Sequence, residues 1–460
     1  MRSLNAWAAQ QPVPGGAAMS RSSGTETAQG SPAAESSTQA SIDKAYAKPS
    51  IFIAGSLAID LSCDYALQDH QRAAGGATLK PAYHTSNPAQ IRQSLGGVGS
   101  NVARAAHLMG ADVRLCSAVG DDLGGKAALK ALADADMDTT GVQTLSQASG
   151  SRTAQYVAVN DSSKDLVLAM ADMSILESSS VNVGGVADTM QNTWIPQLND
   201  TRPSHLVLDG NWSSQHLAKW LEAGSGANAF IVFEPVSNAK CTAPFRLPNP
   251  HILPTFPNHS ITLTTPNRYE LAAMHSAARE GGSLERSDWW EVIDALGIPS
   301  SGARTQMALA TSNQLVDQGI PQQSVQLLPF FPEICTKLGS EGVLVTQILR
   351  ASDPRLTDGD YAPFILSRCA NGTEETLGVG GIYMRLFPAI EEVSEQDIVS
   401  VNGVGDTFVG TLVAGLARAK ENSKEGRVED FVDIAQRAAV LTLKSRESVA
   451  PGLGTLRMLI

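Results

Sequence analysis

Cysteine is scarce in this chain and never falls at a spacing typical of metal or redox sites. The 460 residues include five cysteines, with no Cys-x2-Cys pair and no His-Glu-x2-His stretch. Structural zinc sites and disulfide frameworks need such clusters. The sequence therefore predicts inert thiols in a reducing compartment and no structural metal site.

A long apolar run and an excess of positive charge are also missing. No stretch reaches the ~18 apolar residues of a membrane-spanning helix. Acidic residues outnumber Lys and Arg by 46 to 34, a formal net charge of −12, which argues against binding to nucleic acid. We expect a cytoplasmic protein with no membrane or nucleic-acid partner. Mitochondrial import is the alternative, because no acidic residue precedes Glu26.

The composition divides the chain into a tail and a long folded part. Residues 1–49 are rich in small and polar residues, which predicts a disordered tail. From residue 50 onward, short apolar runs alternate with helical patterns, which predicts an α/β fold with a mostly parallel, helix-covered sheet. The expected strands are 51–55, 113–119, 205–208, 230–233 and 342–345, and the expected helices are 101–109, 123–132 and 215–222.

One segment departs from this alternation. Residues 153–159 and 166–170 predict two strands joined by a polar turn, a hairpin-like unit suited to a lid. Three further stretches, about 177–200, 276–323 and 351–376, are expected to be loop-like insertions that explain the length of the chain.

The strongest chemical signal is a glycine turn at residues 399–408, Val-Ser-Val-Asn-Gly-Val-Gly-Asp-Thr-Phe, followed by a helical pattern. A Gly-x-Gly turn that opens a helix leaves backbone N–H groups free to bind an anion. Asp406 would repel that anion unless it accepts a proton from a hydroxyl group that attacks a phosphate. The turn alone leaves a structural reading open, because the helix dipole also favours an acid there.

A second glycine cluster, residues 96–99, opens the helix at Asn101, whose amide is suited to sugar hydroxyls. Together with the first turn, it resembles the ribokinase (PfkB) family of carbohydrate and nucleoside kinases. The resemblance extends over about residues 50–453. It rests on six motifs in the family's order: Gly55-Ser56-x3-Asp60, Gly96-Gly97-x3-Asn101, Val119-Gly120-x-Asp122-x2-Gly125, Thr265-Pro266-Asn267-x2-Glu270, Leu338-Gly339-Ser340-Glu341-Gly342 and Gly403-x-Gly405-Asp406.

The resemblance implies a ribokinase-like, Rossmann-type three-layer α/β domain over residues 50–460. A small β lid would be formed by segments at about 60–95 and 151–175. It also implies ATP as the phosphate donor and Mg²⁺ as the metal. Members commonly hold a monovalent cation such as K⁺ near the aspartate turn. Here Ser400-Val401-Asn402 stands where members often have an acid and a Thr before the glycines. The sequence therefore leaves open whether this chain binds a monovalent cation.

The resemblance further implies a role for individual residues. Asp406 would be the catalytic base, beside backbone amides that neutralise charge on the phosphoryl group. Asn267 and Glu270 would organise Mg²⁺ through water. The remaining implied residues are Gly403, Val404 and Gly405 at the turn, Asp60, Gly97 and Asn101 for the sugar, and Asn267, Gly339, Gly342 and Asn402 for the nucleotide.

A narrower resemblance is to pseudouridine kinases, including the kinase half of fungal pseudouridine-metabolising proteins. The residues that carry it are 85–88, 93–99, 153–159, 171–173, 233–237, 400–408 and 441–443. It implies phosphorylation of pseudouridine to pseudouridine 5′-phosphate, with Asn87, Thr153 and Asp172 as substrate-binding lid residues. For Asp172 a solvated turn acid is an equal alternative. Ser100 departs from the pattern, because an Arg is expected there.

Two other functions stay open. One is a kinase of the same family for another sugar or nucleoside, such as ribose or adenosine. The other is a catalytically silent nucleoside-binding protein. Pairing of lid edges in a homodimer is expected from the family. If the chain is complete, we also expect a separate glycosidase that splits pseudouridine 5′-phosphate; otherwise the chain is part of a kinase–glycosidase fusion.

Overall fold

The computed structural model describes residues 50–66, 80–146, 150–162, 164–177, 184–299, 302–369, 377–424 and 426–460. The predicted tail at 1–49 lies outside these residues. All described residues belong to one unit of the chain, which spans 48–460.

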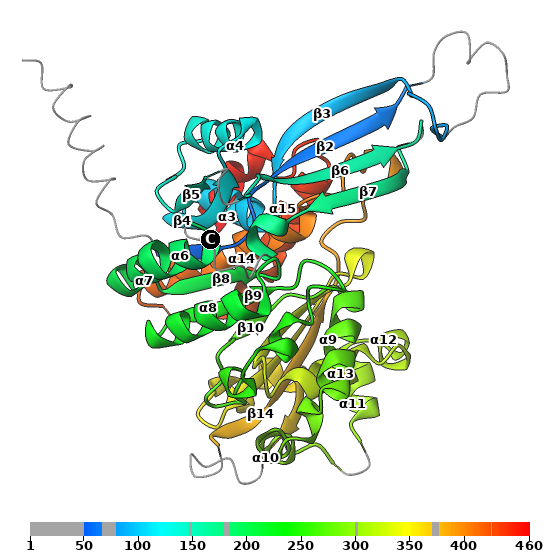
Figure 1. The fold of residues 1–460 in the computed structure, drawn as a ribbon. Coiled ribbons are helices and arrows are strands. Elements are labelled where there is room, and N and C mark those ends of the chain that lie inside the picture. The colour runs from blue at the N-terminus through cyan, green and yellow to red at the C-terminus, as the bar shows by residue number, and fades with distance from the viewer. Residues whose placement is uncertain are drawn as a thin grey trace, which may run out of the picture. The chain divides into compact units, whose positions relative to one another are not determined.

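The main sheet has ten strands in the order β13-β14-β12-β11-β10-β9-β8-β1-β4-β5 (Figure 1). All pairings from β5 to β11 are parallel, and the pairings of β12, β13 and β14 are antiparallel. This confirms the predicted mostly parallel sheet. The strands are β1 Ile51–Ala54, β4 Val113–Gly120, β5 Val142–Leu145, β8 His205–Asp209, β9 Phe230–Glu234, β10 Leu263–Thr264, β11 Glu333–Lys337, β12 Val343–Arg350, β13 Ile365–Arg368 and β14 Val379–Phe387.

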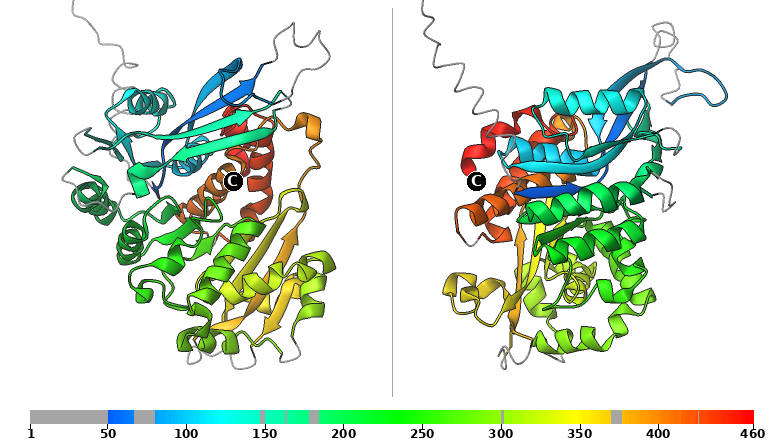
Figure 2. Two further views of the ribbon diagram at one scale, coloured as in Figure 1. Left: turned by 45° about the vertical axis from the view of Figure 1, so that its right-hand side comes forward. Right: turned by 60° about the vertical axis from the view of Figure 1, so that its left-hand side comes forward.

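Helices cover both faces of this sheet, as the two views of Figure 2 show. Side chains alternate along β1, so Phe52 and Ala54 join one hydrophobic core, while Ile51 and Ile53 join the other. The main helices are α3 Val98–Leu108, α4 Leu123–Asp134, α7 Ile195–Thr201, α8 Ser214–Gly226, α9 Arg268–Glu280, α10 Ser287–Ala295, α11 Arg304–Ala310, α12 Asn313–Asp317, α13 Ile320–Leu327, α14 Val404–Glu421 and α15 Val428–Leu443.

A second sheet has four strands in the order β3-β2-β6-β7: β3 Ala89–Gly96, β2 Ala58–Tyr65, β6 Ala154–Asn160 and β7 Leu166–Asp172. The predicted hairpin is present, since β6 and β7 pair antiparallel. Asp60 is in register with Tyr156, and Tyr156 with Ala171, so these three side chains share one face. We call this unit the lid sheet.

The stretches expected to be loop-like insertions contain regular structure, which corrects that expectation. Residues 276–323 include α10, α11 and α12, and residues 351–376 include the strand β13. The reason is apolar burial: Trp289, Val292 and Leu315 are buried in the larger hydrophobic core. Residues 178–183 and 370–376 lie outside the described part.

Candidate active site

A cavity of about 1330 Å³ lies where the parallel strands end. In open parallel sheets, ligands bind at this carboxyl edge. The strand order β11-β10-β9-β8-β1 fixes which residues meet there. One lining residue follows closely after each strand: Gly339, Asn267, Val236, Asn211 and Ser56, in that order.

The predicted glycine turn forms the start of α14. Gly403 has φ 72°, a left-handed conformation that favours glycine. A Cβ atom on residue 403 would lie 1.8 Å from the carbonyl oxygen of Ser448, so no other residue fits without moving the backbone. The turn therefore presents the first amides of α14 to the cavity, where they can bind an anion.

Asp406 lies in the first turn of α14 and lines the cavity. Its Oδ2 atom accepts a hydrogen bond of 2.8 Å from Nδ2 of Asn101. Burial raises the pKa of Asp406 to about 6, against the hydrogen bond from Asn101 and the positive charge of Lys337, which lower it. Such a carboxylate is ionised near neutral pH yet basic enough to accept a proton from a reacting hydroxyl group.

Two further groups complete this part of the cavity wall. Burial, and then the charge of Asp406, raise the pKa of Asp60 to about 6, while Arg104 opposes the rise. Asn101 Oδ1 is buried without a hydrogen-bond partner among the described residues. A buried acceptor of this kind calls for a donor, which the hydroxyl group of a ligand can supply.

Sequence reasoning missed a buried ion pair beside the turn. Nζ of Lys337, the last residue of β11, lies 2.9 and 3.0 Å from the two carboxylate oxygens of Glu234, at the end of β9. It also lies 3.2 Å from where a Cβ on residue 405 would stand. Although burial alone would lower the pKa of Lys337, the adjacent carboxylates raise it. The available signal was the charged residue at the end of each of these two strands, β9 and β11.

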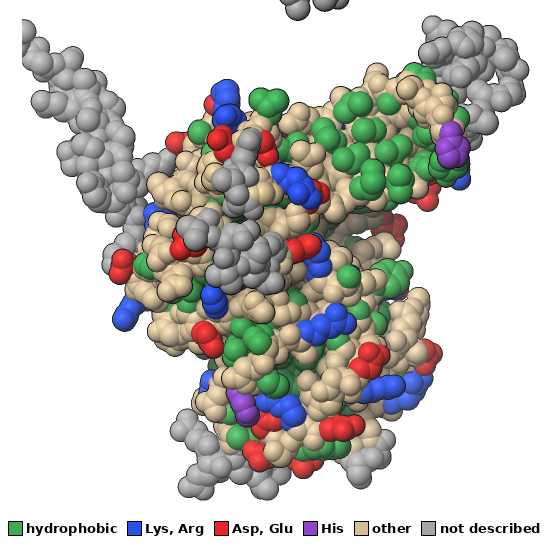
Figure 3. Space-filling model, viewed as in Figure 1, with side chains coloured by type: hydrophobic (Ala, Val, Ile, Leu, Met, Phe, Trp, Pro, Cys, Tyr) green, Lys and Arg blue, Asp and Glu red, His purple; other side chains and the backbone are tan. Residues whose placement is uncertain are grey.

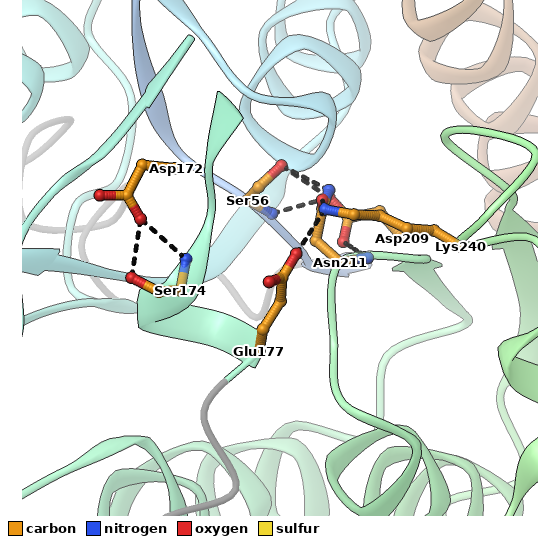
Figure 4. Close-up of polar contacts among 7 residues, drawn as sticks. All are labelled: Ser56, Asp172, Ser174, Glu177, Asp209, Asn211 and Lys240. Atoms are coloured by element: carbon orange, nitrogen blue, oxygen red, sulfur yellow. Dashed lines mark hydrogen bonds and ion pairs between the residues drawn. The ribbon is translucent and has the colours of Figure 1, made fainter. Parts of the chain in front are cut away.

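A second missed group is Asp209, at the end of β8 and 2% exposed. Its Oδ2 accepts hydrogen bonds from the backbone and hydroxyl of Ser56 and from the backbone of Gly99, at 2.7, 2.9 and 3.1 Å. Asn211 Nδ2 donates to the same atom at 3.0 Å (Figure 4). Asp209 thus ties the end of β1 to the start of α3, and so holds Asn101 in place.

Asn267 and Glu270 form a capping box at the start of α9. Asn267 Oδ1 accepts from the backbone of Tyr269 and of Glu270, and Glu270 Oε2 accepts from the backbone of Asn267 at 2.8 Å. Both residues line the cavity. Their carboxylate and amide groups are therefore held rigidly at its edge.

Twelve of the fifteen predicted site residues line this one cavity. They are Asp60, Gly97, Asn101, Asn267, Glu270, Gly339, Gly342, Asn402, Gly403, Val404, Gly405 and Asp406. Their assigned roles remain predictions.

Three predicted substrate residues are not among the residues that line the cavity. Asn87 bonds to the backbone of Ala82 at the far end of the β2–β3 hairpin. Thr153 Oγ1 donates to Asp122 at 2.6 Å. Asp172 pairs with Arg152 and accepts from Ser174 Oγ at 2.7 Å (Figure 4). Each polar group has a local partner, and a substrate contact for these three residues stays a prediction.

Within the described ranges, no helix is both long and apolar enough to cross a membrane. Among the same residues, no group of three or more His, Cys, Asp or Glu is placed to hold a metal ion.

Comparisons with known proteins agree with this geometry. The model of the pfkB family of carbohydrate kinases matches residues 60–288, about half of the chain. A pseudouridine-metabolizing bifunctional protein of Schizosaccharomyces pombe is 29% identical over 376 residues, which cover 81% of this chain and 44% of that protein. Pseudouridine kinase of Escherichia coli is 31% identical over 159 residues, 35% of this chain and 46% of that protein. The matched residues thus span less than half of either relative.

Solved structures show the same fold. Ribokinase from Cryptococcus neoformans var. grubii serotype A, in complex with ADP, is 16% identical with a TM-score of 0.54, covering 89% of this chain and 99% of its own. Ribokinase from Arabidopsis thaliana, with ribose and ATP, is 14% identical with a TM-score of 0.53, covering 90% and 99%. With its motifs in the family's order on this ribokinase-like fold, the chain belongs to the pfkB family of carbohydrate kinases.

Proposed function

We propose that this protein transfers the γ-phosphate of ATP to the 5′-hydroxyl group of pseudouridine. The observation that carries the kinase chemistry is Asp406 at the amino end of α14, with a pKa raised to about 6 and a hydrogen bond to Asn101. In the proposed step, the hydroxyl oxygen attacks the γ-phosphorus while Asp406 takes its proton. The bond from the γ-phosphorus to the bridging oxygen breaks, and ADP leaves.

The donor set at the carboxyl edge fits Mg²⁺. Among the described residues, six carboxylates line the cavity: Asp60, Glu234, Glu270, Glu391, Glu392 and Asp406. Besides burial, which is the larger cause, the charge of Asp406 raises the pKa of Asp60 and the charge of Glu270 raises that of Asp406; a divalent cation would relieve this repulsion. Mg²⁺ usually keeps several waters and binds through one or two carboxylates and the substrate phosphates. Glu270, with Asn267, would hold it through water, and the ion would neutralise phosphate charge.

The other predicted site residues that line the cavity divide into three groups under this proposal. Asp60 and Asn101, at the lid-sheet end of the cavity, would bind the ribose hydroxyls. Gly339, Gly342 and Asn402, at the β11 end, would border the nucleotide. The amides of Gly403 to Gly405 would stabilise the charge that develops on the transferred phosphoryl group. A monovalent cation near the Asp406 turn stays a prediction from the family resemblance alone.

Pseudouridine is favoured over other sugars because two curated relatives carry that substrate in their names. The Ser-Val-Asn lead-in at residues 400–402 also agrees with that subfamily. As partners, we propose a second copy of the chain and, for the product, a glycosidase that splits pseudouridine 5′-phosphate. The dimer is supported by the outer face of the lid sheet, where Figure 3 shows hydrophobic side chains gathered.

The direct test is ADP release from Mg²⁺-ATP with pseudouridine, uridine, adenosine and ribose offered separately. Turnover selective for pseudouridine supports the proposal. Turnover selective for another acceptor keeps the kinase and overturns the substrate. No turnover with any acceptor, together with measurable binding of a nucleoside, indicates a silent nucleoside-binding protein.

A further inference from the structure

The two lysine side chains that line the cavity differ in the strength of their ion pairs. Lys240 and Lys337 are the two Lys or Arg side chains among the described residues that line it. Lys337 has a side chain 16% exposed and is paired with Glu234, which is 4% exposed. Breaking such a buried pair leaves an uncompensated carboxylate and is costly. We therefore expect Lys337 to stay paired with Glu234 when a ligand binds.

Lys240 is held much more weakly. Its Nζ donates to Asn211 Oδ1 at 2.6 Å and lies 2.7 Å from Glu177 Oε1 (Figure 4). The side chains of Lys240 and Glu177 are 25% and 49% exposed, so this pair is more accessible to water than Lys337 with Glu234. Exposed ion pairs contribute about 0–1 kcal/mol, because water screens them and solvates the released carboxylate. An anion of higher charge inside the cavity can therefore replace Glu177 at little cost.

The position of Lys240 is set by the strand order. The Lys240 loop follows β9. On one side of β9, β8 leads to Asn211 and β1 leads to the lid sheet, at the proposed acceptor end. On the other side, β10 and β11 lead to Asn267 and Gly339, at the proposed nucleotide end. Neighbouring strands lie about 4.8 Å apart. The Lys240 loop thus lies between the acceptor end and the nucleotide end of the cavity, where a transferred phosphoryl group must pass.

The backbone of this loop supports a functional role. Val236, which also lines the cavity, has φ 72°. A β-branched residue rarely adopts this conformation, which carries a strain of about 1–3 kcal/mol and is typical of ligand-binding segments. The turn continues with a hydrogen bond of 3.1 Å from the backbone of Lys240 to the carbonyl of Ser237. Lys240 follows this strained turn and lines the cavity.

We propose that Lys240 binds the γ-phosphate of the nucleoside triphosphate, and that Glu177 positions the Lys240 ammonium until the nucleotide displaces it. This rests on the proposed kinase function and adds a phosphate ligand to it. Glu177 follows directly on the lid sheet, in the short helix α5 Ser174–Glu177. Nucleotide binding would therefore also release a contact between the lid sheet and the core.

The test is calorimetric titration of the full chain with Mg²⁺ and either AMP-PNP or ADP, in the wild type and in Lys240→Met. A charged hydrogen bond to the γ-phosphate predicts that Lys240→Met weakens AMP-PNP binding about 10- to 100-fold while leaving ADP binding within about 2-fold. Glu177→Gln should strengthen AMP-PNP binding by up to about 5-fold. Lys130→Met is the matched control, because it removes an exposed, paired lysine from α4, outside the cavity.

Equal weakening of ADP and AMP-PNP in Lys240→Met, or no weakening of either, overturns the assignment. Weaker AMP-PNP binding in Glu177→Gln overturns the displacement. These titrations need no turnover. A wild type that binds AMP-PNP but phosphorylates no acceptor therefore contradicts the proposed kinase function separately.

Discussion

Asn101 and Asp406 are 305 positions apart in the sequence, yet Nδ2 of Asn101 donates a 2.8 Å hydrogen bond to Oδ2 of Asp406. Each residue lies in the first turn of its helix, α3 and α14 respectively, and the two helices pack against each other. The carboxylate thus stands beside two helix amino ends, whose dipoles favour its charge. Burial opposes these effects and holds the pKa of Asp406 at about 6.

Replacing Asn101 by Ala should shift the pH dependence of the reaction. The hydrogen bond from Asn101 lowers the pKa of Asp406, so its loss should raise that pKa further. As the proposed base, Asp406 is active when deprotonated, so the acid limb of the kcat profile should move to higher pH. A rise of about one unit would lower kcat at pH 6 about 5-fold. A profile with an unchanged acid limb would show that the bond does not tune the base.

Replacing Asp406 by Asn should remove the proposed base and keep the volume of the side chain. General-base catalysis typically contributes about 10²- to 10⁴-fold, so kcat should fall by that range and the acid limb near pH 6 should disappear. Steady-state kinetics across pH 5–9 measure both effects. Retention of wild-type kcat would exclude Asp406 as the base.

Asp60→Asn should stabilise the protein above pH 6. The folded-state pKa of Asp60 is raised from 3.8 to about 6, so the folded chain holds a proton that the unfolded chain loses. The favourable contribution is present below about pH 4 and is lost as the pH rises through about 6. Urea unfolding at pH 8 should show a gain on the order of 2 kcal/mol, and none at pH 3.5.

The control for this measurement is Asp134→Asn, since Asp134 is exposed and pairs with Lys130 outside the cavity. It should change the free energy of unfolding by less than about 0.5 kcal/mol at either pH. A gain for Asp60→Asn that is independent of pH would argue against a charge effect.

Lys337→Met should destabilise the fold, because it leaves Glu234 buried without its partner. Breaking a buried ion pair costs about 3–5 kcal/mol. The double variant Lys337→Met with Glu234→Gln should recover much of that loss, since the buried charge is then gone. Urea unfolding of the two single variants and the double variant completes the cycle. Additive losses would mean that the two side chains do not interact.

The outer face of the lid sheet should carry the contact of a homodimer. Leu168 and Met170 on β7 and Ile91 on β3 are exposed by 51%, 58% and 67%. Ile91 and Leu168 lie in one row across the sheet, through Cys63 and Val159. Leu168→Lys should therefore convert a dimer to a monomer in sedimentation velocity, whereas Leu309→Lys, at an exposed apolar site on α11, should not. A monomeric wild type would contradict this prediction.

Much of the fold could be read from the sequence because its signals are local. The strands at 51–54, 205–209 and 230–234 are short apolar runs, which a buried parallel sheet requires. The direction of β12 could not be read, because an apolar run has the same composition in either direction. The helices in 276–323 were missed because their apolar residues are recognisable as core only once the partner surface is known.

Some residues of the candidate site could likewise be recognised from the sequence, and others could not. The glycine turn before Asp406 was recognisable because the φ of 72° at Gly403 and its close approach to Ser448 require a residue without a side chain. The pair of Lys337 with Glu234 was not recognisable, because 103 residues separate the partners and each lies at the end of an ordinary strand. Thr153 and Asp172 carried a family pattern, but local partners bind their polar groups.

The sequence by itself determined the family resemblance, five strands of the main sheet and the glycine turns at its carboxyl edge, because glycine turns, apolar strands and helix starts are encoded within a few positions. Only the tertiary structure decided which charges face one another there. Three features depend on distances and burial, which the packing of remote segments sets. They are the raised pKa of Asp406, the buried ion pair of Lys337 with Glu234, and the more exposed ion pair of Lys240 with Glu177.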